Sequence, residues 1–249
     1  MRKLTPMQWL TYGFGISMAI LMVLTLFLPG LAPQTTTTQD IPPTEPPPVP
    51  TLPPPLADFS SISFETDALE DTGLFAVGVP TGWERTTATG PNQQGSVSLN
   101  NGDQLSVIQV QVEEGPPVAS AQELGDLYFT PARLSGSWTE YRSPEELLRE
   151  VVDDRLIIEF ALENFQGQEF FARHVSWTYV TWIYTARVVV PRNATDLLDF
   201  LLDPVIDSIK PQTQFQTTPV TWNAYYDERS NAILRHPNGW AVTDGGDPG

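Results

Sequence analysis

The sequence predicts an α+β domain built on a mostly antiparallel sheet and preceded by one N-terminal transmembrane helix. Three features of the 249-residue chain predict it. An uncharged apolar run comes first, a proline-rich segment follows it, and the remainder alternates between strand patterns of period two and capped helical patterns. Because helices lie between and after the strands, we expect them to cover the sheet.

The apolar run spans residues 9–28 and carries no charged side chain. At ~1.5 Å per residue, a helix of this length crosses the ~30 Å hydrocarbon core of a bilayer. Arg2 and Lys3 precede it, and this positive charge predicts a cytoplasmic N-terminus. We therefore predict a cytoplasmic stub (1–8) and a single-pass signal anchor (9–31) in a bacterial cell membrane. The alternative is a cleaved secretory signal, although the run is long for one and Pro33 follows the best cleavage site.

A proline-rich stalk is predicted over residues 32–57. Ten prolines lie between positions 33 and 55, together with four consecutive threonines at 35–38. Prolines at this density hold the chain near polyproline II, an extended form without internal hydrogen bonds. We interpret the stalk as a semi-rigid spacer.

The net charge of the chain comes entirely from the residues beyond the stalk. Arg2 and Lys3 balance Asp40 and Glu45, so the net charge of −17 belongs to the residues after position 57. Such an acidic surface repels nucleic acid and anionic lipid, and we expect neither as a partner. The acidic segment 244–247 lacks the spacing and the bidentate Glu of a calcium-binding loop.

Strands are predicted first where apolar residues alternate between turn signals. In the segment 105–112 the even positions are apolar, so we expect them to face the core. A turn at Gln166-Gly167 is expected to join two long strands into a hairpin. The predicted strands cover residues 75–79, 96–99, 105–112, 156–165, 169–179 and 182–190.

Three helices are predicted from their starting signals. Ser120 and Glu123 form a capping box that opens the first. Ser143-Pro144 opens the second, which we expect to run to Val152 with its leucines and valines inward. Asn193 is expected to cap the third, whose apolar stripe is Leu197, Leu198, Leu201, Leu202, Val205, Ile206 and Ile209.

A short motif occurs twice. Pro237-Asn238-Gly239-Trp240 repeats Pro80-Thr81-Gly82-Trp83 at an offset of 157 residues, about one domain length. Apolar residues precede the proline in both copies. We interpret the chain as one domain over 58–211, followed at 212–249 by a linker and the truncated start of a second copy.

The segment 75–83, which reads Phe-x-Val-x-x-Pro-x-Gly-Trp, resembles the opening of PsbP-like domains. The closing Tyr184…Val189-Val190-Pro191, followed by a helix that runs into Asp207-Ser208-Ile209, is similar to their end. The resemblance covers about residues 60–210. It implies an α/β/α sandwich on an antiparallel sheet, and a protein that binds other proteins rather than one that catalyses a reaction. It supplies no metal ligands and no partner-contacting residues.

Catalytic chemistry is not predicted from the residues. The chain has no cysteine and two histidines, His174 and His236, and it contains neither a nucleophile elbow nor a phosphate-cradling glycine loop. His174 is expected to be a packed or surface imidazole. Adjacent carboxylates such as Glu145-Glu146 point apart, and we interpret them as solvated surface. We predict no catalytic residue, no cofactor and no metal site.

Aromatic residues supply the predicted binding surface. Phe171, Trp177 and Tyr179 fall in one predicted strand, which is apolar or aromatic on both faces, and Trp182 begins the next strand. Either helices cover both faces, or one face is exposed for binding. We predict that the protein is a non-catalytic, membrane-anchored, extracytoplasmic module that binds a protein or another envelope component. A small-ligand-binding module and a hydrolase of unfamiliar type are the alternatives.

Overall fold

The structure, a computed structural model, describes residues 48–86, 95–118, 120–179, 182–227, 229–230 and 232–243. The predicted stub, the anchor and most of the stalk lie outside these ranges. No helix within them combines the length and apolar character needed to cross a bilayer. The residues from Pro48 onward form one compact unit and are described here.

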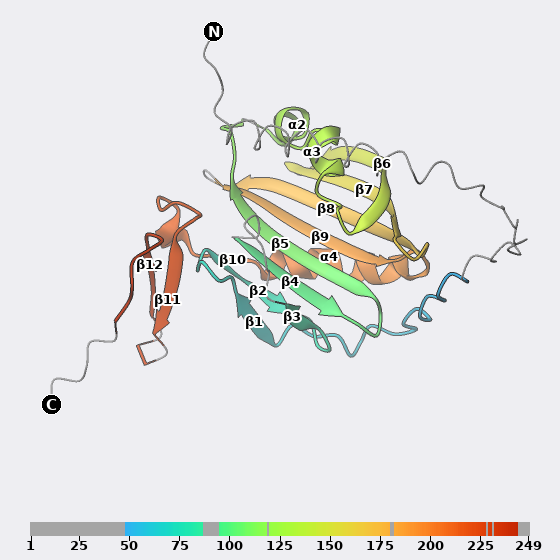
Figure 1. Cartoon of the computed structure of the whole chain (residues 1–249), viewed down its shortest axis with the longest axis horizontal. Helices are drawn as coiled ribbons and strands as arrows, with labels where there is room; N and C mark the ends of the chain where they lie inside the picture. The colour runs from blue at the N-terminus through green and yellow to red at the C-terminus, as the bar shows by residue number, and fades with distance from the viewer. Residues whose placement is uncertain are drawn as a thin grey trace, which may run out of the picture. The chain divides into compact units, whose positions relative to one another are not determined.

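A seven-stranded antiparallel sheet organises this unit (Figure 1). Its strands lie in the order β3-β4-β5-β9-β8-β7-β6, so β9 is central and β3 and β6 are the edges. Their bounds are β3 (Glu84–Thr86), β4 (Ser96–Asn101), β5 (Ser106–Glu114), β6 (Tyr141–Val152), β7 (Arg155–Asn164), β8 (Glu169–Tyr179) and β9 (Trp182–Pro191).

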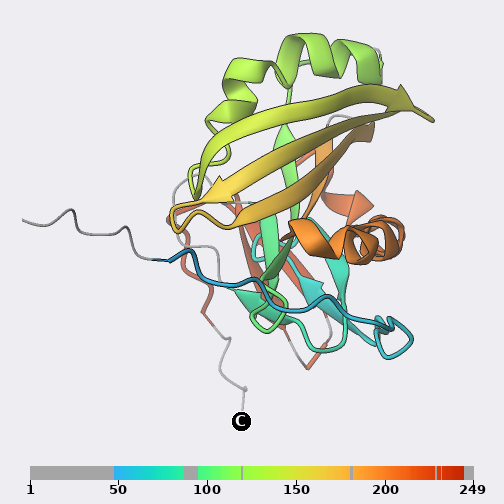
Figure 2. The ribbon, with the colours of Figure 1, turned by 90° about the vertical axis from the view of Figure 1, so that its right-hand side faces the viewer.

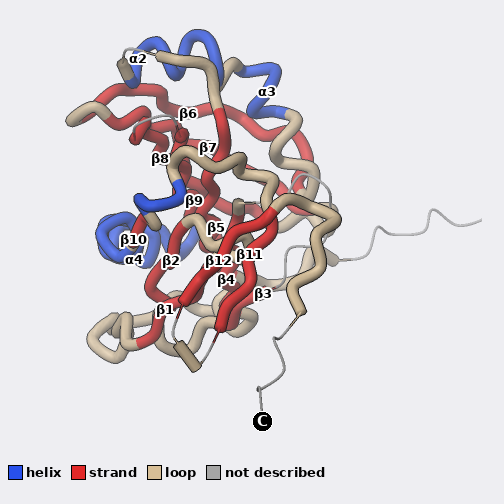
Figure 3. Tube along the Cα trace, turned by 90° about the vertical axis from the view of Figure 1, so that its left-hand side faces the viewer, coloured by secondary structure: helices blue, strands red, loops and turns tan. Residues whose placement is uncertain are grey.

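Two smaller sheets complete the strands (Figure 3). One has three antiparallel strands in the order β1-β2-β10, and the other is a hairpin of β11 and β12. Their bounds are β1 (Thr66–Leu69), β2 (Phe75–Val79), β10 (Lys210–Pro211), β11 (Asn223–Asp227) and β12 (Ala232–His236).

Helices cover both faces of the large sheet, which makes the fold α+β (Figure 2). On one side lie α2 (Ala121–Glu123), the π-helical turn η2 (Leu124–Tyr128) and α3 (Pro131–Ser135). On the other lies α4 (Thr195–Ser208), which follows the 3-10 turn η3 (Arg192–Ala194). A further 3-10 turn, η4 (Thr213–Phe215), comes after β10.

The strand pleat produces two cores, one on each face of the large sheet. The core on the α4 side contains the even positions of β5, as the alternation predicted, with the apolar stripe of α4 and Val77 of β2. The core on the other side joins Leu124, Phe129 and Trp138 of the α2–α3 segment to the even positions of β7. Each core residue is thereby assigned to a face by its position along the strand.

The largest difference from prediction is residues 143–152, which form strand β6 rather than a helix. A tight turn explains it. Asp153 and Asp154 both have positive φ, 48° and 60°, and directly join β6 to β7 as a two-residue hairpin turn. Pairing with β7 overrides the helical spacing of the leucines and valines, because a cross-strand ladder satisfies the backbone that a helix would otherwise satisfy.

The structure also checks two predicted helix caps, of which one is correct and one is wrong. Ser120 caps α2 as expected, since its side chain accepts a hydrogen bond from the Glu123 amide. The Asn193 cap is wrong: α4 begins at Thr195 without a side-chain cap, and the Asn193 amide donates instead to the Pro53 carbonyl at 3.1 Å. Asn193 is thereby used to hold the end of the stalk, and Gln168 holds the Pro50 carbonyl in the same way at 3.1 Å.

Candidate binding surface

The α4 side of the sheet is only partly covered. Arg173 of β8 marks the limit of the cover, because it binds Asp199 of α4 at 2.7 Å and Glu159 of β7 at 2.7 Å. Beyond this bridge, β6, β7 and β8 turn five apolar or aromatic side chains to the same face, and each of them stays half-buried or exposed. We call this set the open strip: Leu148, Val152, Ile157, Trp177 and Tyr179.

Register explains why these residues share a face. Val152 pairs with Arg155, and Glu150 pairs with Ile157, in the β6–β7 ladder. Ile157 in turn pairs with Val175 of β8, which lies in the core on the α4 side. Paired residues in an antiparallel ladder point to the same face. Leu148, Val152 and Tyr179 are the exposed members, at 37%, 42% and 42% of their surface.

Aromatic stacking fixes the position of Trp177. Its ring stacks on Tyr184 with centroids 5.6 Å apart and an interplanar angle of 15°. The Arg155 guanidinium lies 5.7 Å from the centroid of the Trp177 ring, within reach of a cation–π contact. Tyr179 meets the same Tyr184 ring edge-on at 6.2 Å. These contacts hold the two aromatic members of the strip, Trp177 and Tyr179, in defined positions.

Tyr184 of β9 lies beside Trp177 on the same face of the sheet and has an unusual hydroxyl. The residue is fully buried, and its Oη has no hydrogen-bond partner among the described residues. Burial raises the pKa of this phenol well above its usual value, and the neighbouring Tyr179 adds to the effect. The group stays neutral and uncompensated, which is uncommon for a buried donor.

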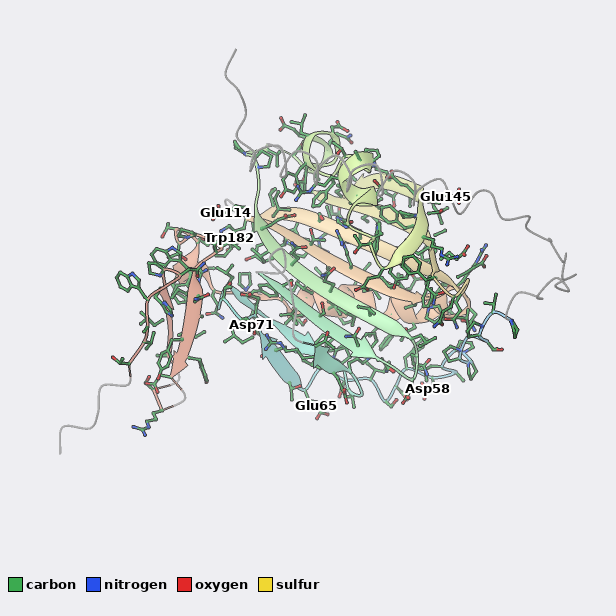
Figure 4. All side chains as sticks on the ribbon, viewed as in Figure 1. Asp58, Glu65, Asp71, Glu114, Glu145 and Trp182 are labelled. Atoms are coloured by element: carbon green, nitrogen blue, oxygen red, sulfur yellow. The ribbon has the colours of Figure 1, made fainter. Side chains whose placement is uncertain are left out.

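The structure separates the four aromatic residues predicted as a surface. Tyr179 is exposed, and Trp177 is half-buried in the strip. Phe171 is half-buried against the core on the α4 side. Trp182 is 1% exposed and belongs to that core, so its place on a surface is wrong. Figure 4 shows Trp182 beside Glu114, its ladder partner, whereas Glu145 lies far off on β6. As an even position of the central strand β9, Trp182 is covered on its own face.

The strip ends at the β6 edge of the large sheet, where the described residues add no further strand. In the large sheet β6 pairs with β7 alone, so its outer backbone groups have no strand partner in that sheet. Register shifts interrupt the ladder between Arg142 and Leu148, whereas residues 148–152 pair regularly. Bulges protect sheet edges from pairing with other chains, and the regular part lacks that protection. The apolar side chains of the regular part stay exposed, Leu148 at 37%, Val151 at 39% and Val152 at 42%, as does Leu147 at the register shift, at 51%.

On the opposite face of β6, Arg149 connects the strand to the segment that contains α2 and η2. Its Nη1 donates to the carbonyls of Phe129 at 3.0 Å and Gly125 at 3.4 Å, and Nε and Nη2 bind Glu146 at 2.6 and 2.7 Å. The guanidinium thereby satisfies carbonyls at the end of η2 that have no helical partner. The α2–η2 segment is held over this face of β6, so the other face and the edge carry the open surface.

A second cluster, beneath α2–α3, is polar and buried. His174 Nε2 lies 2.6 Å from Ser176 Oγ, and Ser176 Oγ lies 2.8 Å from Thr185 Oγ1. Arg187 Nε donates to His174 Nδ1 at 3.1 Å. Phe129 packs edge-on against His174, with centroids 4.8 Å apart, and Trp138 lies under the Arg187 guanidinium at 5.0 Å.

The direction of these hydrogen bonds decides what the cluster can do. A guanidinium only donates, so His174 Nδ1 accepts and the ring proton of the neutral imidazole is on Nε2. Nε2 then donates to Ser176, which leaves no free nitrogen to take a proton from the serine. Burial lowers the pKa of His174 well below its usual value, and Arg187 adds to this. The His174–Ser176 pair therefore serves packing in this arrangement, as the sequence interpretation of His174 expected.

Sequence reasoning missed the β6 members of the strip. Leu148 and Val152 were assigned to the inner face of a helix, so they were not considered with Trp177. One signal is present: Asp153 and Asp154 lie between two apolar segments, 151–152 and 156–158, at the position of a hairpin turn. The Asp-Asp sequence is a weaker turn signal than Asn-Gly, and the strong start signal Ser-Pro-Glu-Glu outweighed it.

Comparisons with known proteins give fold likenesses only. No protein-family model matches the chain, and no curated protein matches it. Among solved structures, the PsbP protein CyanoP of Synechocystis sp. PCC 6803 is similar with a TM-score of 0.41 and 14% identity over 62% of this chain and 95% of its own. A crystal structure from Bacteroides thetaiotaomicron VPI-5482 has a TM-score of 0.40 and 10% identity over 68% of this chain and 55% of its own. Values this low assign neither a family nor a function.

Proposed function

We propose that this protein is a membrane-anchored, extracytoplasmic PsbP-like domain that binds a protein partner and does not catalyse a reaction. The observation that carries the proposal is the regular, uncovered edge of β6 at residues 148–152, together with the open strip beside it. The edge offers backbone groups to a strand of another chain, and the strip offers apolar side chains, with Glu150 and Arg155 on the same face, to the side chains of that strand. The apolar run at 9–28 supports the anchor.

Charge selects the kind of partner. Glu145 and Glu150 are exposed on β6, and Asp153 and Asp154 are exposed in the turn that follows. A second copy of residues 148–152, paired antiparallel about Glu150, would place the two Glu150 side chains opposite each other, which is unfavourable. The surface instead fits an extended segment in which apolar residues alternate with Lys or Arg. We propose such a segment, from a different protein, as the partner.

A photo-crosslinking experiment in native membranes tests the proposal. A photoreactive amino acid replaces Val152 in the full-length protein, and a matched variant carries it at Asp203, an exposed position on α4. We expect a discrete crosslinked product at position 152 only, with the crosslinked peptide rich in apolar and basic residues. Adding Leu148→Glu, which places a further carboxylate at the edge, should abolish that product.

Equal products at positions 152 and 203 would contradict the proposed surface. A product at 152 that survives Leu148→Glu would show that the partner does not lie along the edge. A lipid or small-molecule adduct in place of a peptide would contradict a protein partner.

A further inference from the structure

The hairpin β11–β12 reproduces the hairpin β1–β2 at the offset of 157 residues that the repeated motif gives. β2 covers Phe75–Val79 and β12 covers Ala232–His236, so the two strands have the same length and relative position. β1 and β11 both begin at corresponding residues, Thr66 and Asn223. The two hairpins are therefore aligned at the level of secondary structure, and not only by a four-residue motif.

Register and turn geometry agree as well. Thr66 pairs with Val79 in the first hairpin, and Asn223 pairs with His236 in the second. Both Pro-x-Gly-Trp turns have a glycine with positive φ, 82° at Gly82 and 89° at Gly239. In both, the tryptophan amide donates to the proline carbonyl, at 3.1 Å in the first and 3.2 Å in the second. A shift of one residue in either hairpin would exchange its faces, so identical register is a demanding match.

The two hairpins differ in which face is covered. In the first, Val77 is 0% exposed and Trp83 is 6% exposed, and both lie in the core. At the matching positions of the second, Leu234 is 57% exposed and Trp240 is 69% exposed. The face that forms a core in the first hairpin therefore faces outward in the second. Large apolar side chains exposed together indicate a surface that another element covers.

The second hairpin packs on the preceding domain with its opposite face. Arg235 is 6% exposed, and its Nη2 donates to the carbonyls of Pro219 at 2.8 Å, Val220 at 3.2 Å and Trp222 at 3.1 Å. Ile233 lies on the same face, and its Cγ2 is 3.0 Å from the position that a Cβ on Gly73 would occupy. The hairpin is thus attached to the first domain while its core-forming face stays free.

Exchange of hairpins between two copies of the chain does not account for the match. Arg235 corresponds to Gly78, and the first domain has no room for a side chain there. A Cβ at Gly78 would lie 2.9 Å from Ser208 Cβ and 3.0 Å from Phe64 Cδ1. The second hairpin therefore does not fit the place of β1–β2, and it requires a core of its own.

We infer that β11–β12 is the opening hairpin of a second domain of the same fold, and that the body of this domain, carried by the polypeptide beyond residue 249, covers Leu234 and Trp240. Arg235 then sets the joint between the two domains. The inference is independent of the proposed binding function, since it concerns a different surface. About 28 residues cannot form a core alone, so roughly 100–150 further residues are needed.

The test compares the protein isolated from its native source with the 249-residue chain. Oxidative footprinting read by mass spectrometry reports each tryptophan separately. We expect Trp240 to be oxidised at least about tenfold more slowly in the native protein than in the 249-residue chain. Trp83, buried in the first core, is the internal control and should be protected in both. We also expect intact-mass measurement to show a polypeptide one domain longer.

A substitution pair gives a second readout. Leu234→Asp should lower a melting transition of the native protein by more than about 5 °C and leave the 249-residue chain unchanged within about 1 °C. Val77→Asp, at the matching core position, should destabilise both. A native polypeptide that ends near residue 249, or a Trp240 that is oxidised equally fast in both, would overturn the inference. A Leu234→Asp variant of the native protein with unchanged melting would overturn it as well.

Discussion

β9 and β6 are long strands of the same sheet with opposite environments. β9 is buried along nearly its whole length, because α4 covers one face and the α2–α3 segment covers the other. β6 is exposed along nearly its whole length, although four of its twelve residues are leucine or valine. The comparison teaches that apolar content does not decide burial in this sheet. Position does: a central strand has neighbours on every side, whereas an edge strand depends on what else binds.

The largest expected effect is the difference in unfolding free energy between an alanine substitution in β9 and one in β6. Ile183 of β9 is 1% exposed and Leu148 of β6 is 37% exposed. Ile183→Ala leaves a cavity in the core and should cost about 2–5 kcal/mol of unfolding free energy. Leu148→Ala should cost less than about 0.5 kcal/mol. Urea unfolding of both variants measures the difference, and similar losses would show that a partner-free β6 is buried after all.

On the side covered by α2 and α3, the buried His174 should make the unfolding free energy depend on pH. The pKa of His174 is lowered in the folded protein by burial, so the unfolded chain binds the proton more tightly. The contribution of neutral His174 to the unfolding free energy is therefore fully present above the ordinary histidine pKa of about 6.5, and it falls as the pH drops below that value. The slope is at most about 1.4 kcal/mol per pH unit for one proton.

Urea unfolding between pH 7.5 and 5 measures this slope. His174→Gln should flatten it, and His236→Gln should leave it in place because His174 remains. If the His174→Gln variant kept the full slope, another group would be responsible, and the buried imidazole would not be the acid-sensitive element of the fold.

Arg149 of β6 holds the α2–η2 segment against the covered face of the strand. Arg149→Met keeps much of the aliphatic stem but removes the hydrogen bonds to the Phe129 and Gly125 carbonyls. We expect a loss of about 1–2 kcal/mol, concentrated in the α2–η2 segment. Hydrogen exchange of residues 121–128 should rise, while exchange in α4 stays unchanged as the internal control. Uniformly faster exchange would mean that Arg149 supports the whole fold and not one side of it.

The smallest effect concerns the turn that makes β6 a strand. Asp153 and Asp154 occupy the left-handed region, which glycine adopts at the least cost and which asparagine and aspartate adopt more readily than other residues. The double substitution Asp153→Asn with Asp154→Gly should stabilise the protein by about 0.5–1 kcal/mol. Thermal unfolding measures the gain. The matched control, in which both aspartates are replaced by alanine, should be destabilised, and a gain from both double substitutions would exclude this turn geometry.

The sequence predicts the strands with strong alternation and misses the one whose pattern is ambiguous. The even positions of β5, the β7–β8 hairpin and the apolar stripe of α4 were all recoverable, because each has a clear period and a clear boundary. Residues 143–152 carry the start signal of a helix together with apolar spacing that fits either structure. The decision between them comes from pairing with β7, a contact that no local pattern contains.

The candidate surface was predictable only in part for the same reason. The sequence singles out Trp177 and Tyr179 because a strand that is apolar or aromatic on both faces has either cover on both faces or one exposed face. Whether a given face is covered depends on where α4 lies, which local spacing does not give. Trp182 was therefore placed outside when α4 and the neighbouring strands bury it, and Val152 was missed because its strand was not recognised.

The last residues of the stalk lie along the folded unit, held where Gln168 binds the Pro50 carbonyl and Asn193 binds the Pro53 carbonyl. A mechanical load applied through the N-terminal segment would therefore reach these two side-chain amides before it reached any strand. The two hydrogen bonds would break one after the other, and the first strand to feel tension would be β1. In the proposed membrane-anchored protein, such a load would thus lengthen the connection to the anchor by the residues up to Phe59, whose ring stacks on Phe200 of α4, while the sheet kept its register.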